Sequence, residues 1–303
     1  MSTKTACFIF FACLAVLAAC TRNTDVRAPA HEPKLVLHGY VAVGERFEVS
    51  VGRTLAMNVP AWDSNALVKN AWVLLYDNGV FADSLRYDSI RRRYASNLVT
   101  AASGHTYRVV AGVAGMTSVD AEATAPEPVP AISVSHIRNA RLTTDGAPLN
   151  DIRFRFNDPA GNNFYLAAVY PAGSHGGFLC VYTYEPSIEK YTGELLAFDR
   201  DACIDNDEIL FTDRSFSGTT KEIILSADAA QMESYTDPSG NIQRPVLRRL
   251  NVSEDHYRYF KHMISLSRDL GGPTFTDPVP VKGNVRNGYG LFSVFAASVD
   301  SLP

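Results

Sequence analysis

The stretch KLVLHGYVAVGERFEVSV (residues 34–51) decides the class of the fold. Residues 34–43 are rich in β-branched and aromatic side chains, and residues 46–51 alternate between polar and apolar side chains. Gly44 and Glu45 lie between them as a turn. Alternation with period two beside such a turn is typical of a β-hairpin. The folded part of the chain is therefore predicted to begin with two antiparallel strands.

Short strand patterns continue beyond this hairpin, at residues 71–76, 93–95 and 106–110, and the turn Asp77-Asn78-Gly79 follows the first of them. Strands that recur roughly every 8–12 residues, without a long helical pattern between them, indicate an antiparallel sandwich. We therefore expect an immunoglobulin-like β-sandwich domain over residues 34–125.

Alternate prolines in the stretch 126–131 break this pattern, because proline removes a backbone donor and favours an extended chain. We interpret this stretch as a Pro-rich linker and residues 132–303 as a second β-rich domain. In that domain a turn at 157–162 is expected to return the strand 152–156 into the strand 164–170. Further strands are predicted at 178–184, 208–211, 221–225, 246–252 and 288–295.

One segment of the second domain has a helical period, near residues 254–269. Ser253 is a typical N-cap, and acidic residues follow it in the first turn. Apolar side chains then recur at helical spacing, and Gly271-Gly272 ends the pattern. The predicted fold is mainly β, with two antiparallel β-sandwich-like domains, the second carrying one packed amphipathic helix.

The N-terminus has the pattern of a lipoprotein signal peptide. Lys4 precedes an apolar run at residues 7–19. This run is too short for a membrane-spanning helix, which needs about 20 apolar residues. The run ends in Leu17-Ala18-Ala19-Cys20, which resembles the bacterial lipobox, so residues 1–19 are predicted to be removed and Cys20 to be acylated. The alternative is an ordinary signal peptide with a chance cysteine.

Residues 20–33 have no hydrophobic period and are interpreted as a lipidated tether. Thr21 stands where aspartate would favour retention in the inner membrane, so by resemblance to lipoprotein sorting rules we expect the outer membrane. The net charge of the chain is −4, and this argues against a nucleic-acid partner, which would need a basic surface.

Cys180 and Cys203 are the cysteines that follow Cys20 in the chain. An oxidising compartment favours a disulfide between them, and two buried free thiols are the alternative. The acidic stretch near them places Asp199, Asp201, Asp205 and Asp207 at alternate or near-alternate positions. Such carboxylates are candidate ligands of a hard cation such as Ca²⁺, but EF-hand spacing fails, and we favour a solvated acidic loop without a metal.

Tyr182, Tyr184 and Tyr191 fall near the acidic stretch and are candidate ligand-binding residues, because aromatic rings offer large rigid contact areas. Alternatively, Tyr182 and Tyr184 share one strand face and simply pack in the fold. No HExxH, CxxC or GxxxxGK[ST] motif is present, so the sequence supports no zinc site, no phosphate loop and no cofactor. Paired glycosidase carboxylates need no local motif, so the sequence does not exclude them.

The order of several motifs resembles the Bacteroidota lipoprotein family known as domain of unknown function 4249. The motifs are, in chain order, KLVLHGYV, NAWVLLYDNG, NDPAGNNFY, LFTDRSFSG, SEDHYRYFKHM and DPVPVKGNVRNGYGLFSVF. The resemblance extends from about Leu35 to Ala297. It implies an outer-membrane lipoprotein that often accompanies a TonB-dependent transporter, and it supplies no catalytic residues.

Three functions therefore follow as hypotheses. The first is a non-enzymatic outer-membrane lipoprotein that binds a ligand or partner as an accessory to a TonB-dependent transporter. The second is a hydrolase of surface glycans or peptides, with two converging acids in a cleft. The third is a structural or adhesive surface protein.

Overall fold

The computed structural model describes residues 31–56, 59, 66–173, 177–188, 204, 208–269 and 281–302. This part of the chain is mainly β, with several antiparallel sheets and the helix α2 (Glu254–Asp269), which confirms the predicted class and the position of the helix. No helix within it is long and apolar enough to cross a membrane. The strands are β1 (Leu35–Ala42), β2 (Arg46–Arg53), β3 (Trp72–Asp77), β4 (Val80–Ser84), β5 (Arg86–Asp88), β6 (Arg93–Thr100), β7 (Thr106–Gly112), β8 (Val119–Thr124), β9 (Ala131–Leu142), β10 (Pro148–Asn157), β11 (Phe164–Tyr170), β12 (Val181–Tyr182), β13 (Ile209–Thr212), β14 (Thr220–Asp228), β15 (Tyr235–Thr236), β16 (Ile242–Gln243), β17 (Val246–Val252) and β18 (Tyr289–Ser301).

The N-terminal sandwich packs two sheets face to face. One sheet holds β5, β6, β2, β1 and the first half of β18, and the other has the order β4-β3-β7-β8. Because side chains alternate across a strand, Leu35, Leu37 and Val41 of β1 point into one core, together with Phe47 of β2 and Tyr107 of β7. The predicted hairpin at the start of the chain is confirmed as the antiparallel pair β1–β2.

The second sandwich packs the sheet β12-β14-β10-β9 against β13, β11, β17 and the second half of β18. Its core takes alternate residues from both layers, including Phe154 and Phe156 of β10 and Tyr165 of β11. The opposite face of β11 is also buried, because Leu166 belongs to a third cluster with Tyr257 of α2. This burial on both faces explains why β11 has an almost continuous apolar sequence.

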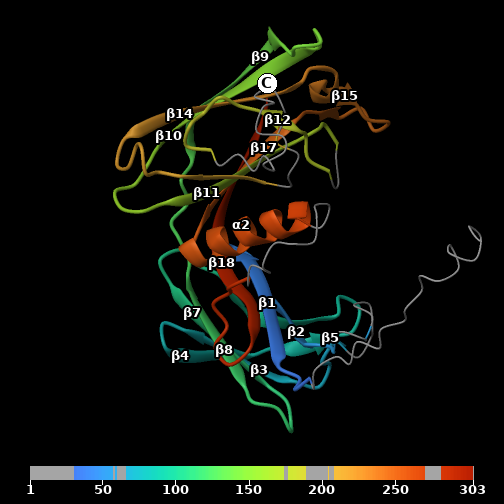
Figure 1. Cartoon of the computed structure of the whole chain (residues 1–303), viewed down its shortest axis with the longest axis vertical. Coiled ribbons are helices and arrows are strands. Elements are labelled where there is room, and N and C mark those ends of the chain that lie inside the picture. Colours follow the sequence, from blue (N-terminus) through green and yellow to red (C-terminus); the bar gives the residue numbers. More distant parts are fainter. Residues whose placement is uncertain are drawn as a thin grey trace, which may run out of the picture.

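Strand β18 joins the two sandwiches into one sheet, as Figure 1 shows where it runs from one to the other. Its first part pairs in parallel with β1, from Tyr289 to Phe295, and its second part pairs antiparallel with β17, from Ala296 to Ser301. A β-carbon at Gly290 would lie 2.0 Å from the carbonyl oxygen of Leu37, so the close approach of β18 to β1 requires glycine there. The C-terminal strand therefore completes the N-terminal sandwich as well as the second one.

Helix α2 covers the outer face of this shared sheet, at the level where the two sandwiches meet (Figure 1). Ser253 caps it, since the backbone N–H of His256 donates to the Ser253 hydroxyl at 3.3 Å. The helix packs on both halves of the molecule: Tyr257 contacts Phe164 of β11, and Phe260 contacts Tyr40 of β1.

Some sequence expectations about the second sandwich were wrong. The segments β10 and β11 are not hairpin neighbours, because β10 pairs with β9 and β14 while β11 pairs with β13 and β17. Residues 157–162 therefore cross between sheets.

A strand expected at 178–184 is confined to Val181–Tyr182, and the long strand β9 was not predicted. β9 is an exposed edge strand with mixed side chains, so it lacks a clear period.

Candidate functional site

Three of the quoted motifs meet on the outer face of the shared sheet. Strand β1 contributes His38 and Tyr40 from KLVLHGYV, on the face opposite its core residues. Helix α2 contributes His256 and Phe260, and β18 contributes Phe295. These side chains form an aromatic cluster, in which the rings of His256 and Phe260 stack with centroids 4.7 Å apart and Tyr40 meets both edge-on.

His256 is the most buried polar group in this cluster, with only 2% of its surface exposed. Its Nδ1 lies 2.7 Å from the Ser293 hydroxyl, and its Nε2 has no hydrogen-bond partner among the described residues. Burial, together with the positive charge of Arg248, lowers the pKa of His256 to about 3. The imidazole is therefore neutral at ordinary pH and offers one hydrogen-bonding nitrogen rather than a charge.

The phenol of Tyr40 is held by a neighbour on the helix. It shares a hydrogen bond with the Tyr259 hydroxyl, and burial raises the pKa of Tyr40 well above its usual range. Burial likewise lowers the pKa of His38, whose ring meets Tyr259 edge-on. The cluster is thus built from neutral rings that carry polar atoms at their edges.

Next to this cluster lies a hollow of about 410 Å³, which we call the junction hollow. Five of its lining residues are aromatic, and Arg248 and Glu208 are its charged residues. The lining is completed by His256, Leu250 and Gly177; the aromatic members are Tyr40, Tyr170, Phe178, Phe260 and Phe295. A concave, mainly aromatic surface with a few polar groups is typical of a site for a small organic ligand.

A second hollow, of about 600 Å³, adjoins the first and shares Tyr40 and Phe295 with it. It is polar and lined by charged side chains of β2, β5–β6 and the turn before β2: Glu45, Arg46, Glu48, Arg91 and Arg93. The guanidinium of Arg91 is paired with the carboxylate of Glu48. The junction hollow therefore opens toward a polar surface on the N-terminal sandwich.

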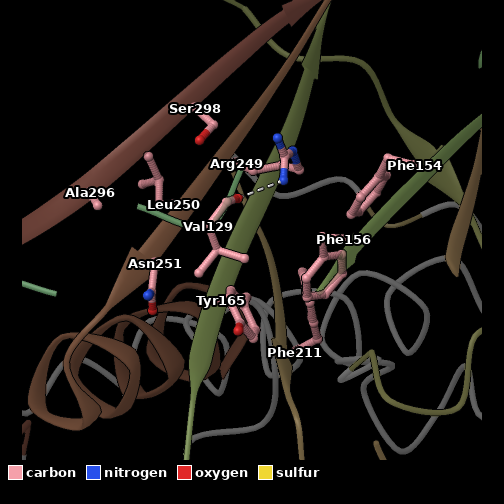
Figure 2. A pocket seen from close by; sticks show the side chains of 10 residues that line it. All are labelled: Val129, Phe154, Phe156, Tyr165, Phe211, Arg249, Leu250, Asn251, Ala296 and Ser298. Atoms are coloured by element: carbon pink, nitrogen blue, oxygen red, sulfur yellow. Dashed lines mark hydrogen bonds between the residues drawn. The ribbon is translucent and has the colours of Figure 1, made fainter. Parts of the chain in front are cut away.

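A different pocket lies inside the second sandwich and is shown in Figure 2. Arg249, 7% exposed, donates through Nη1 to the carbonyl of Val129 at 3.1 Å and pairs through Nη2 with Asp300 at 2.9 Å. Asn251 donates to the carbonyl of Glu127 at 2.9 Å. The remaining space is about 10 Å³, room for one water at most. This pocket fastens the Pro-rich linker to β17 and leaves no space for a ligand.

Two buried carboxylates connect the motifs NDPAGNNFY and LFTDRSFSG. Asp158 accepts from the Tyr165 hydroxyl at 2.6 Å and from the backbone N–H of Gly218 at 2.9 Å, and Asp213 accepts from Asn163 at 3.0 Å. Burial raises the pKa of Asp158, and the neighbouring Asp213 carboxylate raises it as well. Both carboxylates are nearly inaccessible, at 5% and 2% exposure, so they anchor the loops β10–β11 and β13–β14 to each other.

The candidate tyrosines are separated from both hollows. Val181 and Thr183 are buried, so Tyr182 and Tyr184 point away from the core of the second sandwich. Tyr184 is 65% exposed, and the guanidinium of Arg141 lies 5.7 Å from its ring centroid. Tyr191 lies outside the described residues, as do the cation candidates Asp199, Asp201, Asp205 and Asp207. Within the described residues, no group of three His, Cys, Asp or Glu side chains is placed to hold a metal.

Cys20 and Cys203 also lie outside the described residues. Cys180 is disulfide-bonded. The residue after Cys203, Ile204, exchanges two backbone hydrogen bonds with Val181, at 3.2 and 2.7 Å. This places the chain next to Cys203 beside the chain next to Cys180, and the pairing of the two cysteines stays a prediction.

The sequence did not single out the junction hollow. Arg248 and His256 belong to different elements and Glu208 lies 40 residues before Arg248, and a strand or helix pattern explains Arg248 and His256 without a site. The available signal was the set of motifs that carry the family resemblance, because His38, Tyr40, His256 and Phe295 all belong to them.

The fold and the hollow define a class of protein: two β-sandwiches that share one strand, with an aromatic hollow under a helix at their junction. The sequence model of the family described as "Domain of unknown function (DUF4249)" matches residues 22–301, and the chain belongs to this family. No curated protein matches the chain.

Among solved structures, the chain is similar to one described as "Crystal structure of Putative membrane anchored protein from Corynebacterium diphtheriae". The identity is 8% and the TM-score 0.22, over 72% of this chain and 54% of that chain. The chain thus spans about half of the length of that protein.

Proposed function

We propose that this chain is a membrane-anchored binding protein that holds a small organic ligand in the junction hollow. The observation that carries the proposal is the lining of the hollow, in which the rings of Tyr40, Phe178 and Phe260 stand beside the guanidinium of Arg248. The surrounding aromatic rings supply the apolar contact area.

The membrane anchor in this proposal is the acylated Cys20. The family match begins at residue 22, which supports the interpretation of residues 1–19 as a separate signal peptide. We propose that the protein belongs to the outer membrane, as a Bacteroidota lipoprotein, and that it serves a TonB-dependent transporter. The tether would raise the effective concentration of the binding site near the transporter without any new contact.

A hydrolase would need two acids that converge in an accessible cleft. Asp158 and Asp213 are neighbouring acids, but both are buried and hydrogen-bonded to the fold. The pair therefore supports a role in anchoring loops, and binding remains the function that we propose.

The binding proposal is tested with a neutral aromatic probe, N-acetylphenylalaninamide, titrated into the purified protein in a calorimeter. We expect saturable binding with wild-type protein and a loss of about tenfold or more with Phe260→Ala. Met263→Ala is the matched control, because Met263 is on the same helix and 44% exposed. Equal binding by the two variants would place the probe elsewhere and remove the hollow from the proposal.

The anchoring proposal is tested by capture of the acylated protein from its native outer membrane, followed by mass spectrometry. A stoichiometric β-barrel transporter in the wild-type sample, lost in Cys20→Ala, is the expected result. A preparation without such a partner would overturn the accessory role, and self-association in it would favour the adhesive alternative.

A further inference from the structure

Arg248 is the cationic group of the junction hollow, and it is held loosely. Its Nη1 lies 3.9 Å from Oε1 of Glu208, which is too long for a hydrogen bond. Within the described residues no shorter polar contact of its side chain is found, in contrast to Arg249 on the next position of β17, which pairs at 2.9 Å with Asp300. The Arg248 side chain is 35% exposed, so its guanidinium donors are accessible from the hollow.

The guanidinium also lies beside an aromatic ring of the lining. Its central carbon lies 6.0 Å from the ring centroid of Phe295, a cation–aromatic contact that orients the group beside the apolar lining. Arg248 also contributes to the low pKa of His256, so the two groups are close enough to interact electrically. One planar fork of donors and several rings therefore line the same hollow.

A carboxylate is the ligand group that matches these features. Planar guanidinium groups bind carboxylates through two parallel hydrogen bonds, and the pairing gains strength where water is partly excluded. The rings of Tyr40, Phe178 and Phe260 are placed to enclose an aromatic or apolar group joined to that carboxylate. Glu208 limits the number of negative charges that the hollow accepts, which favours a ligand with a single carboxylate.

We infer that the ligand of the junction hollow is a small organic acid in which one carboxylate is attached to an aromatic group, and that Arg248 binds this carboxylate. The inference rests on the proposed function of the same hollow and adds to it the chemical class of the ligand. An aromatic amino acid with a blocked amine, or the carboxyl terminus of a peptide that ends in one, has this chemistry.

The test compares two probes that differ only in charge, N-acetylphenylalanine and N-acetylphenylalaninamide, with three proteins. The wild-type protein is expected to bind the acid about tenfold or more tightly than the amide, and Arg248→Gln is expected to reduce this ratio to about one while it keeps its affinity for the amide. Arg258→Gln is the matched control, because Arg258 is exposed on α2 and pairs with Glu254 outside the hollow.

Each result decides between the two claims. A wild-type protein that binds acid and amide equally, or an Arg248→Gln variant that keeps the preference for the acid, overturns the role of Arg248 but leaves the hollow as a binding site. A wild-type protein that binds neither probe overturns the proposed function, and the inference with it. Should Arg248→Gln fail to fold, the ratio measured on wild-type protein alone decides the preference for a carboxylate.

Discussion

The two neighbouring arginines of β17 point to opposite faces of the shared sheet and meet different surroundings. Arg249 faces the second sandwich, where its Nη1 donates to a backbone carbonyl (Figure 2), its Nη2 pairs with the Asp300 carboxylate and the remaining cavity is about 10 Å³. Arg248 faces the junction hollow of about 410 Å³, where its one carboxylate neighbour is 3.9 Å away. An arginine whose terminal nitrogens are paired within the chain stabilises the fold, and an arginine whose terminal nitrogens lack a close partner is available to a ligand.

The largest effect is expected on the stability of the protein when Arg249 is replaced. Arg249→Ala removes the hydrogen bond to Val129 and the pair with Asp300 and leaves a cavity, so it should lower the free energy of unfolding by about 3 kcal/mol. Chemical denaturation measures this. Arg258→Ala, at an exposed pair, is expected to change stability by less than about 0.5 kcal/mol. Equal stability of the two variants would contradict the account of the linker attachment.

The next effect concerns ligand affinity rather than stability. Phe260→Ala removes a ring that lines the hollow and stacks on His256, so affinity for the neutral probe should fall by about tenfold or more, which corresponds to about 1.4 kcal/mol. Arg249→Ala, in protein that remains folded, should bind the probe like wild-type protein. A loss of affinity in Arg249→Ala as large as the loss in Phe260→Ala would contradict the assignment of ligand binding to only one face of β17.

A pH effect follows from His256. Its pKa is lowered from 6.5 to about 3 in the folded protein, so below pH 6.5 the unfolded chain binds a proton that the folded protein does not. The contribution of His256 to the free energy of unfolding is therefore fully present above pH 6.5. It decreases as the pH falls below this value, by up to about 1.4 kcal/mol per pH unit. Urea unfolding at several pH values should show a shallower pH dependence for His256→Asn than for wild-type protein. Parallel curves would show that His256 is accessible to protons.

The smallest effect is expected at the paired carboxylates. Because the pKa of Asp158 is raised, the stabilising protonated form is present at low pH and lost as the pH rises through that raised value. Asp213→Asn removes the neighbouring charge, so it should stabilise the protein by about 1 kcal/mol or less near neutral pH, with the gain vanishing in acid. Glu222→Gln, at an exposed position of β14, serves as the control. Destabilisation by Asp213→Asn at every pH would show that the charge itself holds the loops.

The sequence predicts local features of this molecule well and long-range features poorly. The hairpin at 34–51 and the helix at 254–269 follow from alternation, turn residues and a cap, all of which are local. The parallel pairing of β18 with β1 joins segments separated by some 250 residues and leaves no local pattern. The same holds for β10 and β11, which are close in sequence but lie in different sheets.

The candidate site divides in the same way. Aromatic residues near the acidic stretch were the visible candidates, yet Tyr184 lies beyond the end of β12 and its side chain is exposed. The properties of His256 and Arg248 depend on burial and on neighbours from other elements. Neither can be predicted from the sequence around these two residues. The motifs that resemble the family did contain most of the cluster, but their meeting depends on the sheet that β18 completes.

The most direct test of the account is a crystal structure of the protein with N-acetylphenylalanine bound. The account predicts the phenyl ring among Tyr40, Phe178 and Phe260, and the carboxylate paired with Arg248. A ligand seated at another surface, with the junction hollow empty at saturating concentration, would contradict it.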